Sequence, residues 1–214
     1  MKRNLTVVFT AVLILAIATA ALSQFGMRKI FRGNGDNHRN LVMLENAAQL
    51  QTTFALTSSF SSMFDVRLDS IPDGAAMELN VDLGTLSTGN STLDMETFSP
   101  RFLDWKGNTQ ASFKLIDLTP GRAYTLENEK ATQAAGRGLL TLGSRMDTVT
   151  VEMTLRYLEA NEITRGRLPG DLLHAVGTVY FRLSDFGIQI PQEALLRLDD
   201  RMKLKFDIYN STQM

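Results

Sequence analysis

Residues 148–157 read Thr-Val-Thr-Val-Glu-Met-Thr-Leu-Arg-Tyr, and every second side chain in this stretch is apolar or aromatic. Three further stretches alternate in the same way, at 64–69, 77–83 and 202–209. Because successive side chains of a β-strand point to opposite faces, this period of two predicts strands with one buried and one solvated face. Strands of that kind are typical of antiparallel sheets.

Weaker strand patterns extend this reading along most of the chain. They lie at 52–56, 111–117, 123–128, 133–142, 162–168 and 175–183. Many short strands without long helical segments between them predict an all-β fold, either a sandwich or a barrel.

Three segments interrupt the strand pattern. Residues 87–105 lack alternation and contain Pro100, so they predict a loop or a short helical insertion. Residues 191–200 begin with a proline and have apolar residues at helical spacing, which predicts a short helix or a turn. Residues 41–50 fit a short helix or a first strand equally well.

The composition excludes several classes of function. The chain has 214 residues, a formal net charge of −1 and no cysteine. Dispersed lysines and arginines do not form the clustered basic face that nucleic acids require, and without cysteine there is no disulfide, thiolate nucleophile or zinc–thiolate site. Two histidines are too few for a typical metal site, and the sequence contains no nucleophile elbow. We therefore predict no catalytic residue, no metal, no cofactor and no nucleic-acid partner.

The first residues have the pattern of an export signal. Lys2 and Arg3 precede an apolar run at 5–22, which ends in small residues that suit a cleavage site. Cleavage would leave a mature N-terminus between Ala21 and Phe25. The same apolar run is also at the lower limit of a membrane span, so an uncleaved anchor in the inner membrane is the alternative.

The sequence predicts three regions along the chain. Residues 1–23 form the signal peptide or N-terminal anchor. Residues 24–48 form a linker and N-terminal extension, because 31–39 are rich in glycine, asparagine and arginine. Residues 49–210 form the barrel domain.

Three motifs together resemble those of a known family. They are Leu-Ser-Thr-Gly-Asn at 86–90 with Asp94 and Phe102 after it, Gly-Arg-Gly-Leu-Leu-Thr-Leu-Gly at 136–143, and Arg-Leu-Ser-Asp-Phe-Gly-Ile at 182–188. In their order and spacing they are similar to the YceI-like family of exported bacterial β-barrels. The resemblance implies an antiparallel, lipocalin-like closed barrel of about eight strands. It also implies that a long apolar lipid, typically a polyisoprenoid, is held inside the barrel.

Strand parity selects the side chains that would line such a barrel. We predict a lining made by Phe64, Met77, Leu79, Val81, Phe113, Val151, Met153 and Phe186. Asn90, Asp94, Phe102 and Trp105 are predicted to form a loop or lid at the barrel mouth. For Asn90 and Asp94, helix and turn capping is the competing interpretation of a ligand contact.

Two functional hypotheses follow. The first is a non-enzymatic, periplasmic or secreted barrel whose partner is an apolar lipid or isoprenoid. The second is an envelope structural or interaction protein, with a barrel filled by its own side chains. Its partner would be another envelope protein or a second copy of the chain, and an N-terminal anchor at 5–22 would favour it.

Overall fold

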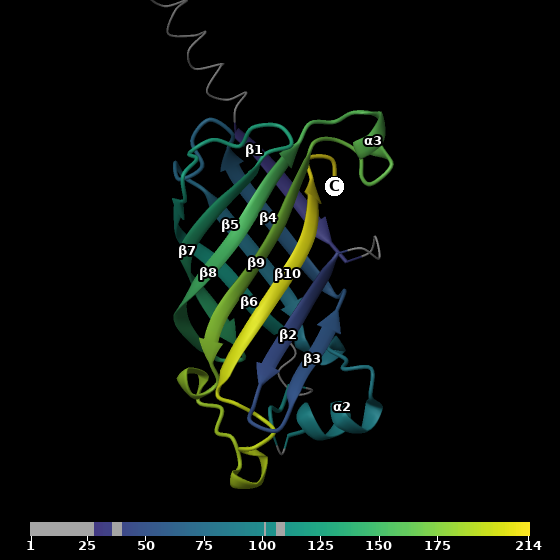
Figure 1. Cartoon of the computed structure of the whole chain (residues 1–214), viewed down its shortest axis with the longest axis vertical. Helices are drawn as coiled ribbons and strands as arrows, with labels where there is room; N and C mark the ends of the chain where they lie inside the picture. The colour runs from purple at the N-terminus through teal and green to yellow at the C-terminus, as the bar shows by residue number, and fades with distance from the viewer. Residues whose placement is uncertain (1–27, 36–39, 101, 106–109) are drawn as a thin grey trace, which may run out of the picture.

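The computed structural model describes residues 28–35, 40–100, 102–105 and 110–214, and it consists mainly of one ten-stranded antiparallel sheet (Figure 1). The strands are β1 (Arg28–Asn34), β2 (Leu41–Ala47), β3 (Thr52–Thr57), β4 (Phe60–Arg67), β5 (Ala76–Asp82), β6 (Gln110–Pro120), β7 (Ala131–Leu142), β8 (Arg145–Leu158), β9 (Leu172–Arg182) and β10 (Arg201–Ser211). Helical turns are short: α2 (Ser91–Thr97), α3 (Glu162–Arg165), η1 (Leu83–Thr85), η2 (Ser184–Phe186) and η3 (Gln192–Ala194). Among the helices within these ranges, none has the length and apolar character needed to cross a membrane.

The ten strands make a closed barrel with eight positions in its wall. β1 and β2 both run antiparallel to β10, and they pair with β4 and β3 respectively. β1 and β2 therefore form one interrupted wall strand, and β3 and β4 form the next. In Figure 1, β1 lies in the upper part of the wall and β2 in the lower part. This confirms the predicted antiparallel closed barrel of eight strands.

The predicted linker is wrong over most of its described length. Residues 28–34 are strand β1, so the wall includes residues well before 49, and residues 41–47 are strand β2, in agreement with the first-strand alternative for 41–50. Gly33 and Asn34 indicated a turn in the sequence. In the fold, Gly33 faces inward, and a Cβ atom there would lie 2.5 Å from the Asn210 side-chain oxygen. The glycine therefore serves a close approach inside a strand rather than a bend.

Two weaker strand predictions are also wrong. Residues 162–168 contain the short helix α3, which starts at a capping box formed by Asn161 and Thr164. Residues 123–128 are a loop that packs over one end of the barrel, where Leu126 donates its backbone N–H to the carbonyl of Leu68. In both places a local cap or a contact to a distant loop overrides a weak alternation.

The inward rows of all the strands meet in a single core. Its largest fully buried side chains include Phe31, Phe64, Phe113, Phe206, Met77, Leu79, Leu140 and Leu155. Two of the aromatic rings lie over glycines of a neighbouring strand: Phe113 covers Gly138, and Phe206 covers Gly177. A Cβ atom at either glycine would lie 2.3 Å from the ring. These glycines make room for aromatic rings inside the barrel.

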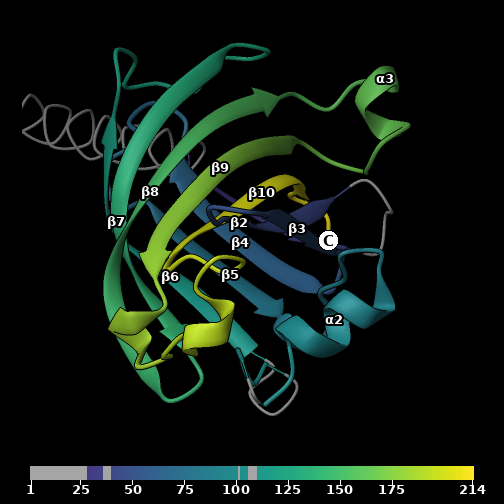
Figure 2. The same cartoon turned by 60° about the horizontal axis from the view of Figure 1, so that its bottom comes forward.

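Loops close both ends of the barrel. At the end nearest the viewer in Figure 2, α2 and the segment between β9 and β10 cross the opening. Phe98, Leu103, Trp105, Ala194 and Leu198 are buried there and belong to the core. At the opposite end, the loop after β4 pairs with the loop before β7, where the backbone N–H of Ile71 donates to the carbonyl of Tyr124.

Candidate functional site

The residues predicted to line the barrel lie on its inner wall, except Phe186, which lies in η2 at one end. Cross-strand pairing places Phe64 beside Met77, and Leu79 beside Phe113. The seven lining residues on strands are Phe64, Met77, Leu79, Val81, Phe113, Val151 and Met153, each at most 5% exposed. Phe186 lies at one end of the barrel, where its ring makes an edge contact with Phe181 at 5.9 Å. The structure thus brings the predicted set together, and its role toward a ligand stays a prediction.

Other inner-wall residues were not in the predicted set. Phe206 belongs to an alternating stretch and could have been found from parity alone. Phe31 could not, because the glycines and amides that follow it predict a linker. Its ring is fully buried and meets Tyr157 edge-on at 6.3 Å. The interior therefore contains more aromatic volume than the sequence indicated.

The interior is filled by these side chains. A hollow bordered by Leu44, Ala55, Phe98, Leu103 and Met202, among others, lies at the end covered by α2 and measures about 10 Å³. That is at the lower limit for one water molecule. Among the described residues, the core side chains are at most 8% exposed, so they occupy the space that a long lipid chain would need.

Asn90 and Asp94 act as caps of the predicted lid. The Asn90 side chain accepts hydrogen bonds from the backbone of Thr92 and Leu93, at 3.0 and 3.2 Å, and so caps α2. The Asp94 carboxylate accepts from the Ser87 hydroxyl and from the Thr88 backbone and hydroxyl, at 2.6 to 2.8 Å. These hydrogen bonds fold residues 87–94 into a compact turn, as the capping interpretation expects.

The aromatic residues of the lid pack onto the barrel. Trp105 is 3% exposed and stacks on Phe98, with ring centroids 5.8 Å apart. Phe102 is partly buried against the same core. In the described part of the lid, these rings act as a plug for one mouth of the barrel.

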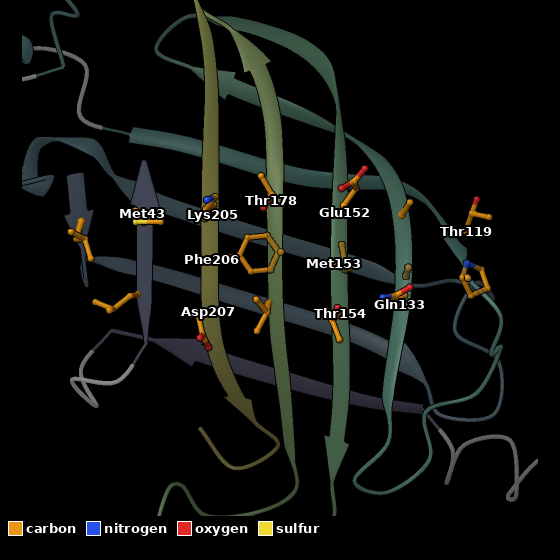
Figure 3. A pocket seen from close by; sticks show the side chains of 18 residues that line it. Met43, Thr119, Gln133, Glu152, Met153, Thr154, Thr178, Lys205, Phe206 and Asp207 are labelled. Atoms are coloured by element: carbon orange, nitrogen blue, oxygen red, sulfur yellow. The ribbon is translucent and has the colours of Figure 1, made fainter. Parts of the chain in front are cut away.

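A large hollow lies on the outer face of the barrel, with a volume of about 810 Å³. Figure 3 shows its lining along the strands from β7 to β10 and on β2. Pairing arranges most of the lining in two outward rows across the sheet. One runs through Leu56, Met43, Lys205, Thr178, Glu152, Ala135 and Thr119, and the next through Leu41, Asp207, Val176, Thr154 and Gln133. This hollow is apolar near β2 and β3 and polar near β7 and β8.

A half-buried ionic cluster near the second barrel end ties β1 to β8 and to Asp171, the residue just before β9. The Lys29 ammonium donates to the Tyr157 hydroxyl at 3.0 Å and to the Asp171 carboxylate. Burial alone would raise the pKa of Asp171, but the hydrogen bonds from Lys29 and from the Ala160 backbone outweigh it and lower this pKa. Burial raises the pKa of Tyr157. The cluster is therefore an ion pair with a neutral phenol, fixed within the wall.

A second ionic cluster joins β2 to β10 on the outer face. Glu45 accepts from Lys203 at 2.8 Å and also from Lys205. These two hydrogen bonds lower the pKa of Glu45. The Lys29–Asp171 pair is balanced in charge, whereas the Glu45 cluster combines one carboxylate with two ammonium groups.

No arrangement for catalysis or metal binding emerges within the described ranges. They contain no group of three or more histidine, aspartate or glutamate side chains placed to hold a metal ion. His174 stacks on the Tyr209 ring at 4.0 Å and hydrogen-bonds Asp207 at 2.7 Å. The ring is thus held between structural partners on the outer face.

Comparisons with known proteins agree with this architecture. The model of the YceI-like domain matches residues 36–209, whereas a search of curated proteins finds no match. BcnA of Burkholderia cenocepacia shares the fold at a TM-score of 0.62 and 15% identity, covering 81% of this chain and 98% of its own.

Two further solved structures share the fold. A polyisoprenoid binding domain from Saccharophagus degradans aligns at a TM-score of 0.57 and 9% identity, covering 86% of this chain and 98% of its own. A YCEI protein of Campylobacter jejuni aligns at 0.56 and 12%, covering 77% of this chain and 86% of its own.

Proposed function

This protein belongs to the YceI-like family, and we propose that it binds a long apolar lipid of the polyisoprenoid type inside its barrel, without catalysing a reaction. The observation that carries the proposal is the inner wall, which is apolar over most of its length and closed on all sides. The similarity to a domain described as polyisoprenoid binding supports the choice of ligand.

The energetic argument is the transfer of an apolar chain from water. Each Å² of apolar surface removed from water contributes roughly 25 cal/mol. Since side chains fill the interior, the lipid would take the place of contacts that the side chains now make with one another. Binding would then depend on the free energy needed to displace rings such as Phe206 and Phe113.

We further propose that the protein is exported. The charged start and the apolar run at 5–22 support this location, and those residues lie outside the described ranges. After cleavage the barrel would be periplasmic or secreted. Without cleavage, the same segment would hold it at the inner membrane.

A second candidate function is favoured by the filled interior. A barrel packed with its own side chains can serve as a rigid scaffold that presents its outer face to another protein. The large hollow between β3 and β7 would then be the contact surface, and the partner an envelope protein or a second copy of the chain.

Binding of a fluorescent polyprenol by the parent protein and by Phe206→Ala separates the two functions. If the lipid enters the interior, removing the Phe206 ring lowers the free energy needed to make room for it. We then expect the variant to bind about tenfold more tightly, a gain of about 1.4 kcal/mol. Phe54→Ala is the matched control, because Phe54 is an aromatic residue of β3 that is 45% exposed. Absence of binding to both the parent and the Phe206 variant would contradict lipid binding and favour the scaffold.

A further inference from the structure

The wall of the barrel is held together unequally around its circumference. β10 pairs with β9 at every residue from Arg201 to Ser211, and β1 pairs with β4 at every residue from Arg28 to Asn34. Between β1 and β10, in contrast, the described residues pair at one position, Arg32 with Ser211. This junction, here called the β1–β10 seam, therefore has a single backbone-paired position; the edge of β3 away from β2 is the other such place in the described wall, with one bridge between Leu56 and Ser87.

Side chains close the seam where the backbone ladder is missing. The Asn40 carboxamide donates to the Tyr209 carbonyl at 3.0 Å and accepts from the Tyr209 N–H at 2.9 Å. These two hydrogen bonds replace the two that a residue of a neighbouring strand would make with the Tyr209 backbone. On the inner side of β1, where Gly33 has no side chain, the Ser62 hydroxyl of β4 donates to the Asn210 carboxamide oxygen of β10 at 2.6 Å.

The ionic cluster of Lys29 adds a contact near the first residue of β1, Arg28. Lys29 belongs to β1, whereas Tyr157 and Asp171 belong to β8 and to the residue just before β9. On the other side of β1, Arg28 forms a two-pronged pair with Asp65 of β4, at 2.8 and 2.9 Å. β1 is therefore fixed to β4 along its whole length, and to the β8–β10 side mainly through side chains.

Phe31 connects the seam to the interior. It lies on β1, is fully buried, and contacts Tyr157 across the core. Movement of β1 away from β10 would withdraw this ring from the core and leave space behind it. Opening of the wall at β1 would therefore also create space inside the barrel.

We propose that the β1–β10 seam is the part of the wall that opens, with β1 carrying Phe31 outward, and that the apolar chain enters the filled barrel there. The entry route rests on the proposed lipid-binding function, whereas the opening itself can be measured without a ligand. A long chain could then slide in sideways while the plugged end of the barrel stays closed.

A cysteine pair across the seam tests the proposal, because the chain has no cysteine of its own. Arg32→Cys together with Ser211→Cys would form a disulfide between paired neighbours of β1 and β10. Thr154→Cys together with Val176→Cys is the matched control, between the fully paired strands β8 and β9. Uptake of a fluorescent polyprenol and amide hydrogen exchange of β1 are followed in the oxidised and the reduced state of each protein.

We expect the oxidised seam variant to lose uptake and to regain it on reduction, while the control takes up the probe in both states. We also expect β1 amides of the parent to exchange faster than β9 amides, and to slow down when the seam is cross-linked. Normal uptake through the cross-linked seam, or β1 exchange as slow as that of β9, would overturn the proposal. Absence of uptake by the parent would overturn the proposed lipid function instead, and the exchange of β1 would still decide whether the seam opens.

Discussion

At the scale of single residues, Phe186 shows how a short motif becomes a structural corner. Its side chain is 4% exposed and packs edge-on against Phe181, and the next residue, Gly187, adopts a left-handed conformation with φ of 71°. Ser184 secures the corner through two hydrogen bonds to Asp200, each at 2.8 Å. The motif at 182–188 therefore closes one end of the barrel.

Replacing Phe186 with alanine should destabilise the protein by about 3–5 kcal/mol, as expected for truncation of a buried aromatic side chain. Chemical denaturation of the parent and the variant measures the change in free energy of unfolding. Leu195→Ala is the control, since Leu195 is 54% exposed in the nearby segment. Equal stability of Phe186→Ala and the parent would show that this corner does not anchor the barrel.

Substitution of Val151 tests whether side chains fill the interior of the barrel. Its side chain is fully buried and is paired with Gly136 on one side and Val179 on the other. An indole at this position would overpack the core, so Val151→Trp should cost about 1–3 kcal/mol. Thr150→Trp places the same ring on the outer face as a control. If Val151→Trp melts at the parent temperature, the barrel contains space that the structure does not show.

At the scale of elements, Asn40 joins the two halves of an interrupted wall strand to β10. The residue is fully buried, and its carboxamide also donates to the Asn34 carbonyl at 2.9 Å. Asn40→Ala would leave backbone groups of Tyr209 and Asn34 without these partners. We expect a loss of about 1–3 kcal/mol and faster hydrogen exchange of the Tyr209 amide. Asn80→Ala, on an exposed position of β5, serves as the control, and slow exchange of Tyr209 in Asn40→Ala would contradict this role.

The pairing of β2 with β10 should depend on pH through Glu45. Its folded-state pKa is lowered by hydrogen bonds from Lys203 and Lys205. A lowered pKa contributes stability above the unfolded value, here 4.5, and that stability is lost as the pH falls through the lower folded-state value. The parent should therefore lose more stability below pH 4.5 than Glu45→Gln.

Thermal melting of the two proteins across this pH range measures the difference. Glu78→Gln is a suitable control, because Glu78 contacts Lys114 at 3.3 Å in a solvent-exposed pair that contributes little. Parallel loss of stability in the parent and Glu45→Gln would contradict the role assigned to Glu45.

The elements also show how far the sequence could predict the fold. Alternation assigned Phe64, Met77 and Val151 to the inner face, because the face of a strand depends only on parity. Strand β1 was missed because Gly33 and Asn34 look like turn residues. A glycine is needed at position 33 because Asn210 and Ser62, which are far from it in the sequence, occupy the space that a side chain would take.

Whether the interior is open or filled was less predictable than which side chains line it. Parity says which side chains point inward but not how far apart opposite walls lie, since the barrel radius depends on strand tilt and stagger. The rings of Phe113 and Phe206 over Gly138 and Gly177 fill the space between the walls, and these pairings join residues far apart in the sequence. The outer hollow likewise depends on seven strands placed side by side.

At the scale of the whole molecule, the barrel combines an apolar interior, a plugged end and a weakly paired seam. A filled core of this kind would be stable without a ligand and could exchange internal side-chain contacts for contacts with an apolar chain. Stability and uptake would then be linked, because a ligand that binds only the folded barrel raises its apparent stability.

The most direct test is native mass spectrometry of the full-length protein purified under mild conditions from the cells that naturally make it. We expect a fraction of the molecules to carry an added apolar mass of the polyisoprenoid class, released on unfolding. The fraction should rise in Phe206→Ala and stay unchanged in Phe54→Ala. A single bare protein mass in the parent and in both variants would contradict lipid binding inside the barrel.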